Sequence, residues 1–406
     1  MNTSARVGAV SSTQVGVALT ISVELEQDAG SAPTLPQLLG ANWREVVERP
    51  ALEVMQALAA VDEPSLVPTL ESVTVHVGVS GSGAVDAVGE AALQAIRGAA
   101  GSAALELGGQ GIRVNTLVTN DQTSSSDVAL TSEYLANSEH SGYTTGATLD
   151  LRRQLTAPVP TRRGGAVLVT GAAGGLGRAG AEALMEQGRT VILTDLPGSA
   201  LDAAASELGA EAVGADLSSA ADLDALAVLV VSRGVDTVVI EHGVSAATRM
   251  DSTYDPARAG LSMRINATSV WELVRRVAGP LRDGGTIVAL SSQAGLVAEE
   301  GYGPYSAAKF AVVGMARSLV SGLADSGVRI QLLCPGPIET ELLQQGLAAA
   351  ARDRGISAAE FAASRAAAIP LRRFGQPRHI GHATRYLTQL DATGVLLAPN
   401  GGEVLT

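Results

Sequence analysis

Strand-like and helix-like segments alternate along the chain from residue 166 to its end. Short runs rich in Val, Ile and Leu are each followed by a longer segment with helical spacing of its apolar residues. The strand-like runs are AVLVT, TVILTD, EAVGADL, DTVVIEHG, TIVALSS, VRIQLLC and GVLLA. Strands that alternate with helices form a parallel sheet covered on both faces. We therefore expect an α/β fold with a doubly wound parallel sheet over residues 166–406.

The composition is that of a folded, acidic protein. Of the 406 residues, 46% are hydrophobic and 17% charged, and the formal net charge is −13. So acidic a surface repels phosphate backbones, which argues against nucleic acid as a partner. The single cysteine, Cys334, excludes an internal disulfide and a cysteine zinc cluster, and the five histidines lack metal-ligand spacing, so we expect no metal. No signal-like segment and no apolar run of about 18 residues occurs, and we expect a cytoplasmic protein without a membrane partner.

The region before residue 150 repeats part of the region after residue 166. A Pro- and Arg-containing stretch at 151–165 separates the two and is predicted to be a linker. The segment GIRVNTLVTN matches GVRIQLLCPG, so that Gly111 corresponds to Gly327 at an offset of 216 (327 − 111). We therefore predict that residues 1–150 form a truncated copy of the domain at 166–406.

A glycine-rich turn joins the first strand of the second region to its first helix. Glycine permits a tight turn and the close approach of a pyrophosphate, and the helix N-terminus offers N–H groups to phosphates. The turn is Thr170-Gly171-Ala172-Ala173-Gly174-Gly175-Leu176-Gly177. Its candidate cofactor-binding residues are Gly171, Gly175, Leu176 and Gly177.

Acidic residues follow the second and third predicted strands. Asp195 ends the second strand, where a carboxylate can accept hydrogen bonds from the adenosine ribose and would repel a 2′-phosphate. Since neither Gly174 nor Leu196 offers a basic group, NAD(H) fits better than NADP(H). The alternative is that Asp195 only caps its turn. Asp216, with Leu217 beside it, is a candidate for the adenine, and the alternative is a solvated loop residue.

Tyr305 and Lys309 lie four residues apart, on one face of a predicted helix. An unperturbed Tyr has a pKa of about 10, too high for a base at neutral pH. An ammonium one turn away would stabilise the phenolate and lower that pKa, so that the Tyr could exchange a proton with a carbinol oxygen. Lys309 is the only lysine, whereas the other 27 basic residues (28 − 1) are Arg. Its retention indicates a role that Arg cannot fill.

These motifs together resemble the short-chain dehydrogenase/reductase (SDR) superfamily over residues 164–402. The glycine-rich turn resembles the family's TGxxxGxG pattern, and Tyr305 with Lys309 resembles its YxxxK pattern. The resemblance implies a Rossmann-type fold and two further catalytic residues, Ser292 to hydrogen-bond the substrate oxygen and Asn266 to support a proton-relay water. It also implies cofactor contacts from the residues after the fourth and sixth strands. These are Gly243, Pro335, Gly336, Ile338 and Thr340, of which Ile338 and Thr340 would hold the nicotinamide carboxamide.

The second region departs from the family at one turn. Ile240-Glu241-His242-Gly243 stands where the family has NNAG, so the glycine is retained and both Asn are lost. This leaves open how the strand end is supported, and whether His242 lies near the active site or only packs in the turn.

The first region resembles the same family from about residue 42, without its chemistry. At the offset of 216, Gly89 and Leu93 replace the Tyr and the Lys. We expect a truncated, catalytically inactive, degenerate SDR copy whose sheet is completed by a strand pair in the first 30 residues. High-molecular-weight 3-oxoacyl thioester reductases have a similar plan.

The sequence therefore predicts an NAD(H)-dependent oxidoreductase that interconverts a ketone and a secondary alcohol, with a 3-oxoacyl thioester or polyketide-like substrate. Two alternatives stay open: a dehydratase or epimerase on the same fold, and a non-catalytic cofactor-binding scaffold or regulatory protein, which the altered turn favours. We expect a homodimer in which residues 42–150 dock on the second half as an internal pseudo-partner.

Overall fold

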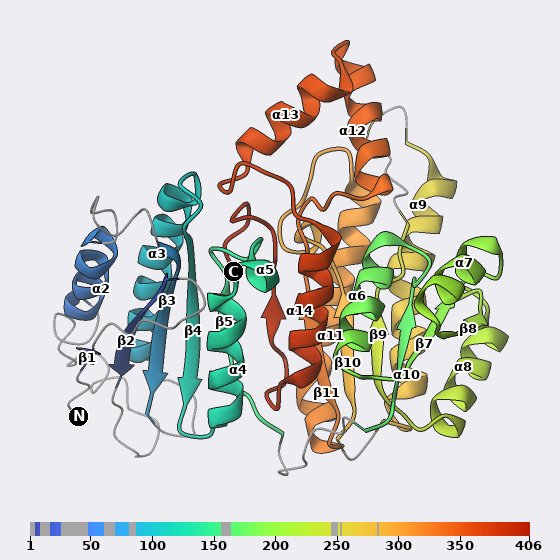
Figure 1. Cartoon of the computed structure of the whole chain (residues 1–406), viewed down its shortest axis with the longest axis horizontal. Coiled ribbons are helices and arrows are strands. Elements are labelled where there is room, and N and C mark those ends of the chain that lie inside the picture. Colours follow the sequence, from blue (N-terminus) through green and yellow to red (C-terminus); the bar gives the residue numbers. More distant parts are fainter. Residues whose placement is uncertain are drawn as a thin grey trace. The chain divides into compact units, whose positions relative to one another are not determined.

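The chain forms two compact units in the computed structural model shown in Figure 1. The first unit comprises Met1–Arg153, Ala366–Arg373 and Gly401–Thr406, and the second comprises Gln154–Arg365 and Phe374–Asn400. The structure describes residues 5–8, 17–25, 48–60, 70–80, 87–155, 164–244, 251, 254–281 and 284–406. Most of the expected linker, residues 156–163, lies outside them.

Seven parallel strands form the sheet of the second unit, in the order β12-β11-β10-β9-β6-β7-β8. They are β6 Ala166–Thr170, β7 Val191–Asp195, β8 Glu211–Gly214, β9 Val235–Ile240, β10 Thr286–Leu290, β11 Arg329–Leu333 and β12 Leu396–Leu397. The order runs one way from β6 through β7 and the other way from β9 through β10. Ligands of such sheets bind at this reversal, outside the carboxyl ends of the strands. The predicted doubly wound fold is confirmed.

Helices connect the strands of the second unit. They are α6 Gly175–Glu186, α7 Ser199–Leu208, α8 Ala220–Ser232, α9 Pro256–Met263, α10 Ser269–Val277, α11 Gly303–Asp325, α12 Glu341–Arg354, α13 Ala358–Ala368 and α14 Pro377–Gln389, with a short 3₁₀ turn η3 at Gln293–Gly295. α6 packs on α14, while α8 packs on α10 and α10 on α11. Buried Leu and Val side chains of α8, α10 and α11 form one core with the sheet strands.

The helix predicted from about residue 258 to 279 is not continuous. A π-helical turn, η2 at Arg264–Thr268, separates α9 from α10. A π turn inserts one residue into the helical path, and such turns are frequent at functional sites.

Among the described residues, one helix is long and apolar enough to cross a membrane by length and composition alone. It is α11, which packs against β10 and β11 and contributes Val312, Ala316 and Val320 to the core. Its apolar character is explained by that packing.

Five strands form the sheet of the first unit, in the order β1-β2-β3-β4-β5. β1 Ala5–Gly8 pairs antiparallel with β2 Val17–Leu25, as expected for a strand pair in the first 30 residues, and the other neighbours are parallel. The remaining strands are β3 Leu70–Val79, β4 Arg113–Asn120 and β5 Thr148–Asp150, and the helices are α2 Arg49–Ala60, α3 Ala87–Gly108, α4 Ser125–Ala136 and α5 Ser138–Ser141. Buried side chains of α2 and α3 form a core with β2, β3 and β4.

The passage from a long helix to the next strand has the same hydrogen bonds in both units. After α3, the N–H groups of residues 110, 111 and 112 bond to the carbonyls of 107, 108 and 107; after α11, residues 326, 327 and 328 bond to 323, 324 and 323. Gly111 and Gly327 both have positive φ, 83° and 72°, a conformation that favours glycine. Each of these residues has its counterpart at the offset of 216.

In both units, the side-chain amide of a strand residue hydrogen-bonds to the turn before the next strand. In the first unit, Asn115 donates to the carbonyl of Thr144 (3.0 Å) and accepts from the N–H of Ala147 (3.1 Å) just before β5. In the second, Gln331 makes the same two bonds before β12, to Ala392 (2.6 Å) and Val395 (3.0 Å). The two sheets therefore share the construction of this edge.

The last residues of the chain belong to the first unit. The N–H of Gly401 donates to the carbonyl of Tyr143 (2.9 Å), and the N–H of Thr406 to that of Gly146 (3.2 Å). A Cβ on Gly101 or Gly146 would lie 2.9 or 2.4 Å from the side chain of Leu405, so both glycines leave room for it. A boundary drawn along the sequence does not anticipate this return of the chain.

Candidate active site

The predicted site residues of the second unit follow the carboxyl ends of neighbouring strands. Gly171 comes directly after β6, Asp195 ends β7, Asp216 follows β8, Gly243 follows β9, Ser292 follows β10 and Pro335 follows β11. Because the strands are parallel, all six segments lie at the same edge of the sheet. The structure thus brings together residues that are more than 160 positions apart in the sequence.

The glycine-rich turn is packed so closely that side chains cannot replace two of its glycines. Gly171 has φ 69°, and a Cβ there would lie 2.7 Å from the Cα of His242. A Cβ on Gly177 would lie 2.3 Å from the carbonyl oxygen of Gly171. α6 begins at Gly175, and its N-cap, Gly174, supplies no side-chain hydrogen bond. The turn therefore presents backbone N–H groups, which suit the pyrophosphate of a dinucleotide.

Asp195 supports this turn. Its Oδ2 accepts from the N–H of Ala173 (3.0 Å), and its Oδ1 accepts from the N–H of Leu196 (2.8 Å). The capping role weighed from the sequence is therefore present. A carboxylate oxygen has two acceptor sites, so Asp195 retains capacity for ribose hydroxyls.

Asp216 is engaged within its own loop. Its Oδ1 accepts from the N–H (2.9 Å) and the hydroxyl (2.8 Å) of Ser218, and these bonds lower the pKa of Asp216. Leu217 beside it is buried. Asp216 is thus a turn residue, and any contact with an adenine would use its remaining acceptor capacity.

The segment after β11 lies against the glycine-rich turn. A Cβ on Gly175 would lie 3.2 Å from the Cγ2 of Thr340. Gly336 donates its N–H to the carbonyl of Pro399 (3.1 Å), and the carbonyl of Pro335 accepts from the N–H of Gln293 (2.8 Å). Ile338 is buried, and Thr340 caps α12 by accepting from the N–H of Leu343 (3.3 Å). The two predicted cofactor segments therefore line the same part of the edge.

The phenol of Tyr305 is half-buried, and the Ser292 hydroxyl lies close enough to act on its pKa. Burial raises the pKa of Tyr305 to about 12, against which the Ser292 hydroxyl acts in the lowering direction. The lowering expected from Lys309 is not found in the chain alone. The Lys309 ammonium is 5.7 Å from the centre of the Tyr305 ring and donates to the carbonyl of Leu290 (3.3 Å). The phenol is therefore protonated at neutral pH.

Lys309 and Asn266 meet at Gly243. Lys309 is 2% exposed, and burial lowers its pKa to about 8. A Cβ on Gly243 would lie 2.7 Å from the Oδ1 of Asn266 and 3.6 Å from the Nζ of Lys309. Asn266 accepts from the N–H of Val244 (3.0 Å) and donates to its carbonyl (3.0 Å), so its amide is fixed. A side chain at position 243 would therefore clash with the amide oxygen of Asn266 but not with Lys309.

Two buried polar residues beneath the site were not assigned a role from the sequence. Glu241 accepts at Oε1 from the hydroxyl of Thr384 (2.6 Å), and burial raises its pKa to about 8. His242 bonds to Thr170 and to Ser269 (2.8 and 2.7 Å). In the sequence, the only sign of these two residues is the departure from the NNAG pattern at 240–243. That departure shows the loss of two Asn but not the new hydrogen bonds.

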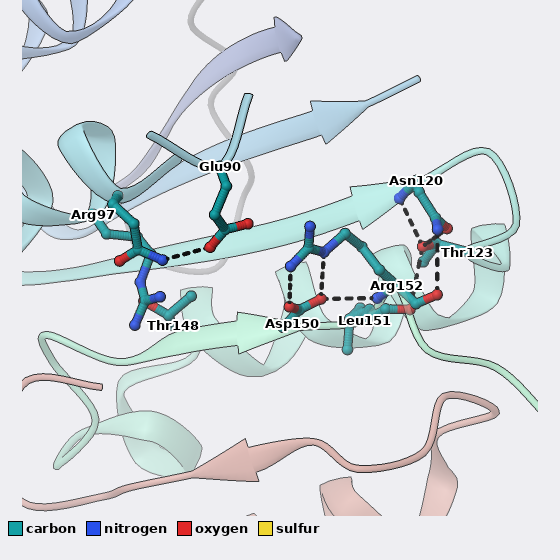
Figure 2. Close-up of polar contacts among 9 residues, drawn as sticks. Glu90, Arg97, Asn120, Thr123, Thr148, Asp150, Leu151 and Arg152 are labelled. Atoms are coloured by element: carbon teal, nitrogen blue, oxygen red, sulfur yellow. Dashed lines mark hydrogen bonds and ion pairs between the residues drawn. The ribbon is translucent and has the colours of Figure 1, made fainter. Parts of the chain in front are cut away.

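At the corresponding edge of the first unit, polar side chains bond to one another and to backbone carbonyls (Figure 2). Asn120 donates to the carbonyl of Arg152 (3.3 Å), and Thr123 donates to Asn120 (3.1 Å) and to the carbonyl of Leu151 (3.3 Å). Asp150 and Arg152 form a two-bond ion pair. In α3, the counterparts of Tyr305 and Lys309 are Gly89 and the buried Leu93, which cannot transfer a proton.

A family model described as enoyl-(acyl carrier protein) reductase matches residues 171–398, more than half of the chain. The chain belongs to the short-chain dehydrogenase/reductase superfamily. The match covers the second unit's edge from the glycine-rich turn to β12, which agrees with the positions of the SDR motifs predicted from the sequence.

Two of the similar curated proteins are named as dehydrogenases of hydroxy compounds. The chain is 30% identical over 248 residues to 2-(S)-hydroxypropyl-CoM dehydrogenase 3 of Xanthobacter autotrophicus, covering 58% of this chain and 95% of that protein. It is 34% identical over 193 residues to 3-hydroxyacyl-CoA dehydrogenase type-2 of Drosophila melanogaster, covering 43% and 76%. An uncharacterised SDR of Sinorhizobium fredii is 29% identical over 246 residues, 43% of its length.

Among solved structures, a variant of actinorhodin polyketide ketoreductase with NADPH resembles the chain with a TM-score of 0.55 and 26% identity. The similarity covers 60% of this chain and 98% of that one. Since SDRs use a nicotinamide cofactor, the fit of the glycine-rich turn to a dinucleotide agrees with the family.

Proposed function

We propose that this SDR is an NAD(H)-dependent oxidoreductase that interconverts a ketone and a secondary alcohol. The proposal rests on the hydroxyls of Tyr305 and Ser292, which lie near each other at the strand edge, and on Lys309 and Asn266, which lie beside Gly243. Two hydroxyls can hold a carbonyl oxygen between them, and one of them can transfer the proton. A scaffold or regulator would not need this pair.

The bound cofactor would supply a hydride to the carbonyl carbon or accept one from the carbinol carbon. Ser292 would orient the oxygen, and Tyr305, protonated because of its raised pKa, would donate a proton to it during reduction. Lys309 would return a proton to Tyr305, and Asn266 would support the relay water that resupplies Lys309. In the oxidative direction Tyr305 would first have to lose its proton before it could accept one from the carbinol oxygen.

We infer NAD(H) as the cofactor from Asp195. Its carboxylate stands beside the turn, where it would accept from a ribose and repel a 2′-phosphate. The similar ketoreductase structure holds NADPH, so the cofactor must be measured for this chain. We expect NADH to bind at least about tenfold more tightly than NADPH, about 1.4 kcal/mol. Calorimetric titration of both, with Asp195→Ser as the comparison, tests this, and equal affinities for the wild-type chain would contradict it.

We propose a 3-oxoacyl thioester or polyketide-like ketone as the substrate. The support is the names of similar proteins, which include a hydroxyacyl-CoA dehydrogenase and a polyketide ketoreductase. The family description names an enoyl reductase instead. Incubation with NADH and either a 3-oxoacyl or an enoyl thioester, followed by mass spectrometry, separates the two. We expect the 3-hydroxyacyl product; reduction of the enoyl thioester alone would contradict the proposal.

For the first unit we propose a degenerate, inactive SDR copy. The matched hydrogen bonds after α3 and α11, and the matched amides Asn115 and Gln331, support a common origin. The absence of a Tyr and a Lys in α3 supports the loss of activity. We further propose that this unit takes the place of a partner subunit, within a homodimer of the whole chain.

A further inference from the structure

His242 belongs to a line of hydrogen bonds that connects β6 to the π turn η2. Its Nδ1 is 2.8 Å from the Oγ1 of Thr170, the last residue of β6, and its Nε2 is 2.7 Å from the Oγ of Ser269. The Ser269 hydroxyl donates to the carbonyl of Ile265 (2.7 Å). The side chain of His242 is buried. The line therefore runs through the interior of the unit.

One arrangement of protons satisfies every group in this line. Because Ser269 gives its only hydroxyl proton to Ile265, it must accept from His242, whose Nε2 then carries the proton. Nδ1 is left as the acceptor for the hydroxyl of Thr170, which itself accepts from the N–H of Glu241 (3.2 Å). The imidazole is thus neutral, and burial together with the Lys309 ammonium lowers its pKa to about 3.

The far end of the line holds the π turn. The N–H of Ser269 bonds to the carbonyl of Arg264 and not to that of Ile265, as an α-helix would require. The Ile265 carbonyl therefore does not accept from the N–H of Ser269, and it accepts from the hydroxyl of Ser269 instead. Asn266, the candidate relay residue, is the next residue in that turn.

The loop that carries His242 also fixes the Asn266 side chain. Val244, two residues after His242, makes both hydrogen bonds to the Asn266 amide, and Ser262 accepts a third (3.2 Å). The segment 242–244 thus makes two kinds of contact. The imidazole of His242 bonds to Ser269, directly after the π turn, and the backbone of Val244 bonds to the Asn266 amide. Displacing the imidazole would allow both contacts to shift.

We propose that His242, as the neutral Nε2–H tautomer, is a positioning residue that holds η2 so that the Asn266 amide faces Gly243 and Lys309. It occupies the place where the resembled family pattern has Ala, and it replaces the support lost with the two Asn. The effect on turnover rests on the proposed function, whereas the effect on the Asn266 amide does not.

The first experiment uses the full chain without cofactor or substrate. Nitrogen NMR of the labelled imidazole should show a protonated Nε2 and an unprotonated Nδ1 for His242 between pH 6 and 8, and His242→Phe should make the Asn266 side-chain amide protons exchange faster with solvent. His242→Gln, which can donate and accept along the same line, should restore slow exchange. A protonated Nδ1, or Asn266 exchange that is unchanged in the Phe variant, would overturn the proposal.

The second experiment measures turnover with the same variants. We expect His242→Phe to lower kcat about ten- to hundredfold with little change in KM or in cofactor affinity, since small misplacements of a relay group are costly. His242→Gln should recover most of kcat. Ser269→Ala, which leaves the imidazole in place but removes its far contact, should resemble the Phe variant.

His76→Phe is the matched control, because His76 bonds to a Thr hydroxyl (2.9 Å) in the first unit's sheet. It should leave kcat unchanged. A His242→Phe variant that melts earlier but keeps its kcat would show a purely structural role and overturn the proposal. If no ketone is turned over by the wild-type chain while the Asn266 amide responds as expected, the proposed function fails and the positioning role stands.

Discussion

Lys309 is enclosed so tightly that its replacement by Arg should abolish most activity. Its side chain is 2% exposed and its Nζ bonds to the Leu290 carbonyl, so a larger planar guanidinium would have to displace its neighbours. We expect Lys309→Arg to lower kcat/KM by about a hundredfold or more. Lys309→Met, which places a neutral side chain of similar length there, serves as the second variant and should fold and be equally inactive. Near wild-type turnover of either variant would contradict the assigned role.

Glu241 should make stability depend on pH. Burial raises its pKa from the ordinary 4.5 to about 8, so the folded chain keeps it protonated while the unfolded chain ionises. The stability contributed by the neutral form is complete below pH 4.5 and is lost as pH rises towards 8, by roughly 1.4 kcal/mol per pH unit. Glu241→Gln cannot ionise and should therefore gain stability relative to wild type over this range.

The measurement for Glu241 is thermal unfolding of both proteins at a series of pH values. The difference in Tm between Glu241→Gln and wild type should grow between pH 5 and 8. A difference that is constant with pH would show that Glu241 is not protonated in the folded chain.

At the scale of elements, the strands were predictable because buried parallel strands are continuous apolar runs, and all seven of the second unit were found near their expected positions. The π turn was not, because a single inserted residue leaves the apolar periodicity on either side intact. It depends on Ser269 and His242, which are distant in sequence from each other. Likewise, Asp195 was predictable as a strand-end acid, but its bond to Ala173 depends on how the turn folds back.

Gly177, in the glycine-rich turn, and Gly314, in α11, are two helix glycines that differ in the space around them. A Cβ on Gly177 would lie 2.3 Å from the Gly171 carbonyl, whereas one on Gly314 in α11 meets nothing within 4 Å. We expect Gly177→Ala to weaken NADH binding at least about tenfold and Gly314→Ala to leave it unchanged, with a stability gain of up to about 1 kcal/mol. Calorimetry and thermal unfolding check both. Equal NADH affinity in the two variants would show that the close packing of this turn is not needed.

In the whole molecule, neither unit is one continuous stretch of chain, because residues 366–373 and 401–406 belong to the first unit. The repeat predicted from Gly111 and Gly327 pointed to a copy, but no pattern in the sequence shows that Leu405 fills the space left by Gly101 and Gly146. That packing joins Leu405 to residues at least 259 positions earlier in the chain (405 − 146). A boundary at 151–165 therefore separates segments that fold together.

Expression of residues 156–406 alone tests the proposed pseudo-partner. The fragment leaves its own last residues without the Tyr143 and Gly146 carbonyls that they bond to in the full chain. We expect an insoluble or newly self-associating product with reduced activity. The full chain and a Leu405→Ala variant of it are the comparisons in light scattering. A soluble fragment with the oligomeric state and turnover of the full chain would show that the first unit has no structural role in the second.

Tyr305→Phe tests whether Tyr305 supplies the proton, because it removes one hydroxyl and leaves the ring in place. Rates of NADH consumption with a 3-oxoacyl thioester are compared for wild type and variant, with NADH affinity measured alongside. We predict that the variant binds NADH as wild type does and reduces the ketone about 10² to 10⁴-fold more slowly, the range for loss of a general acid. A variant that reduces the ketone at the wild-type rate would show that Tyr305 does not supply the proton.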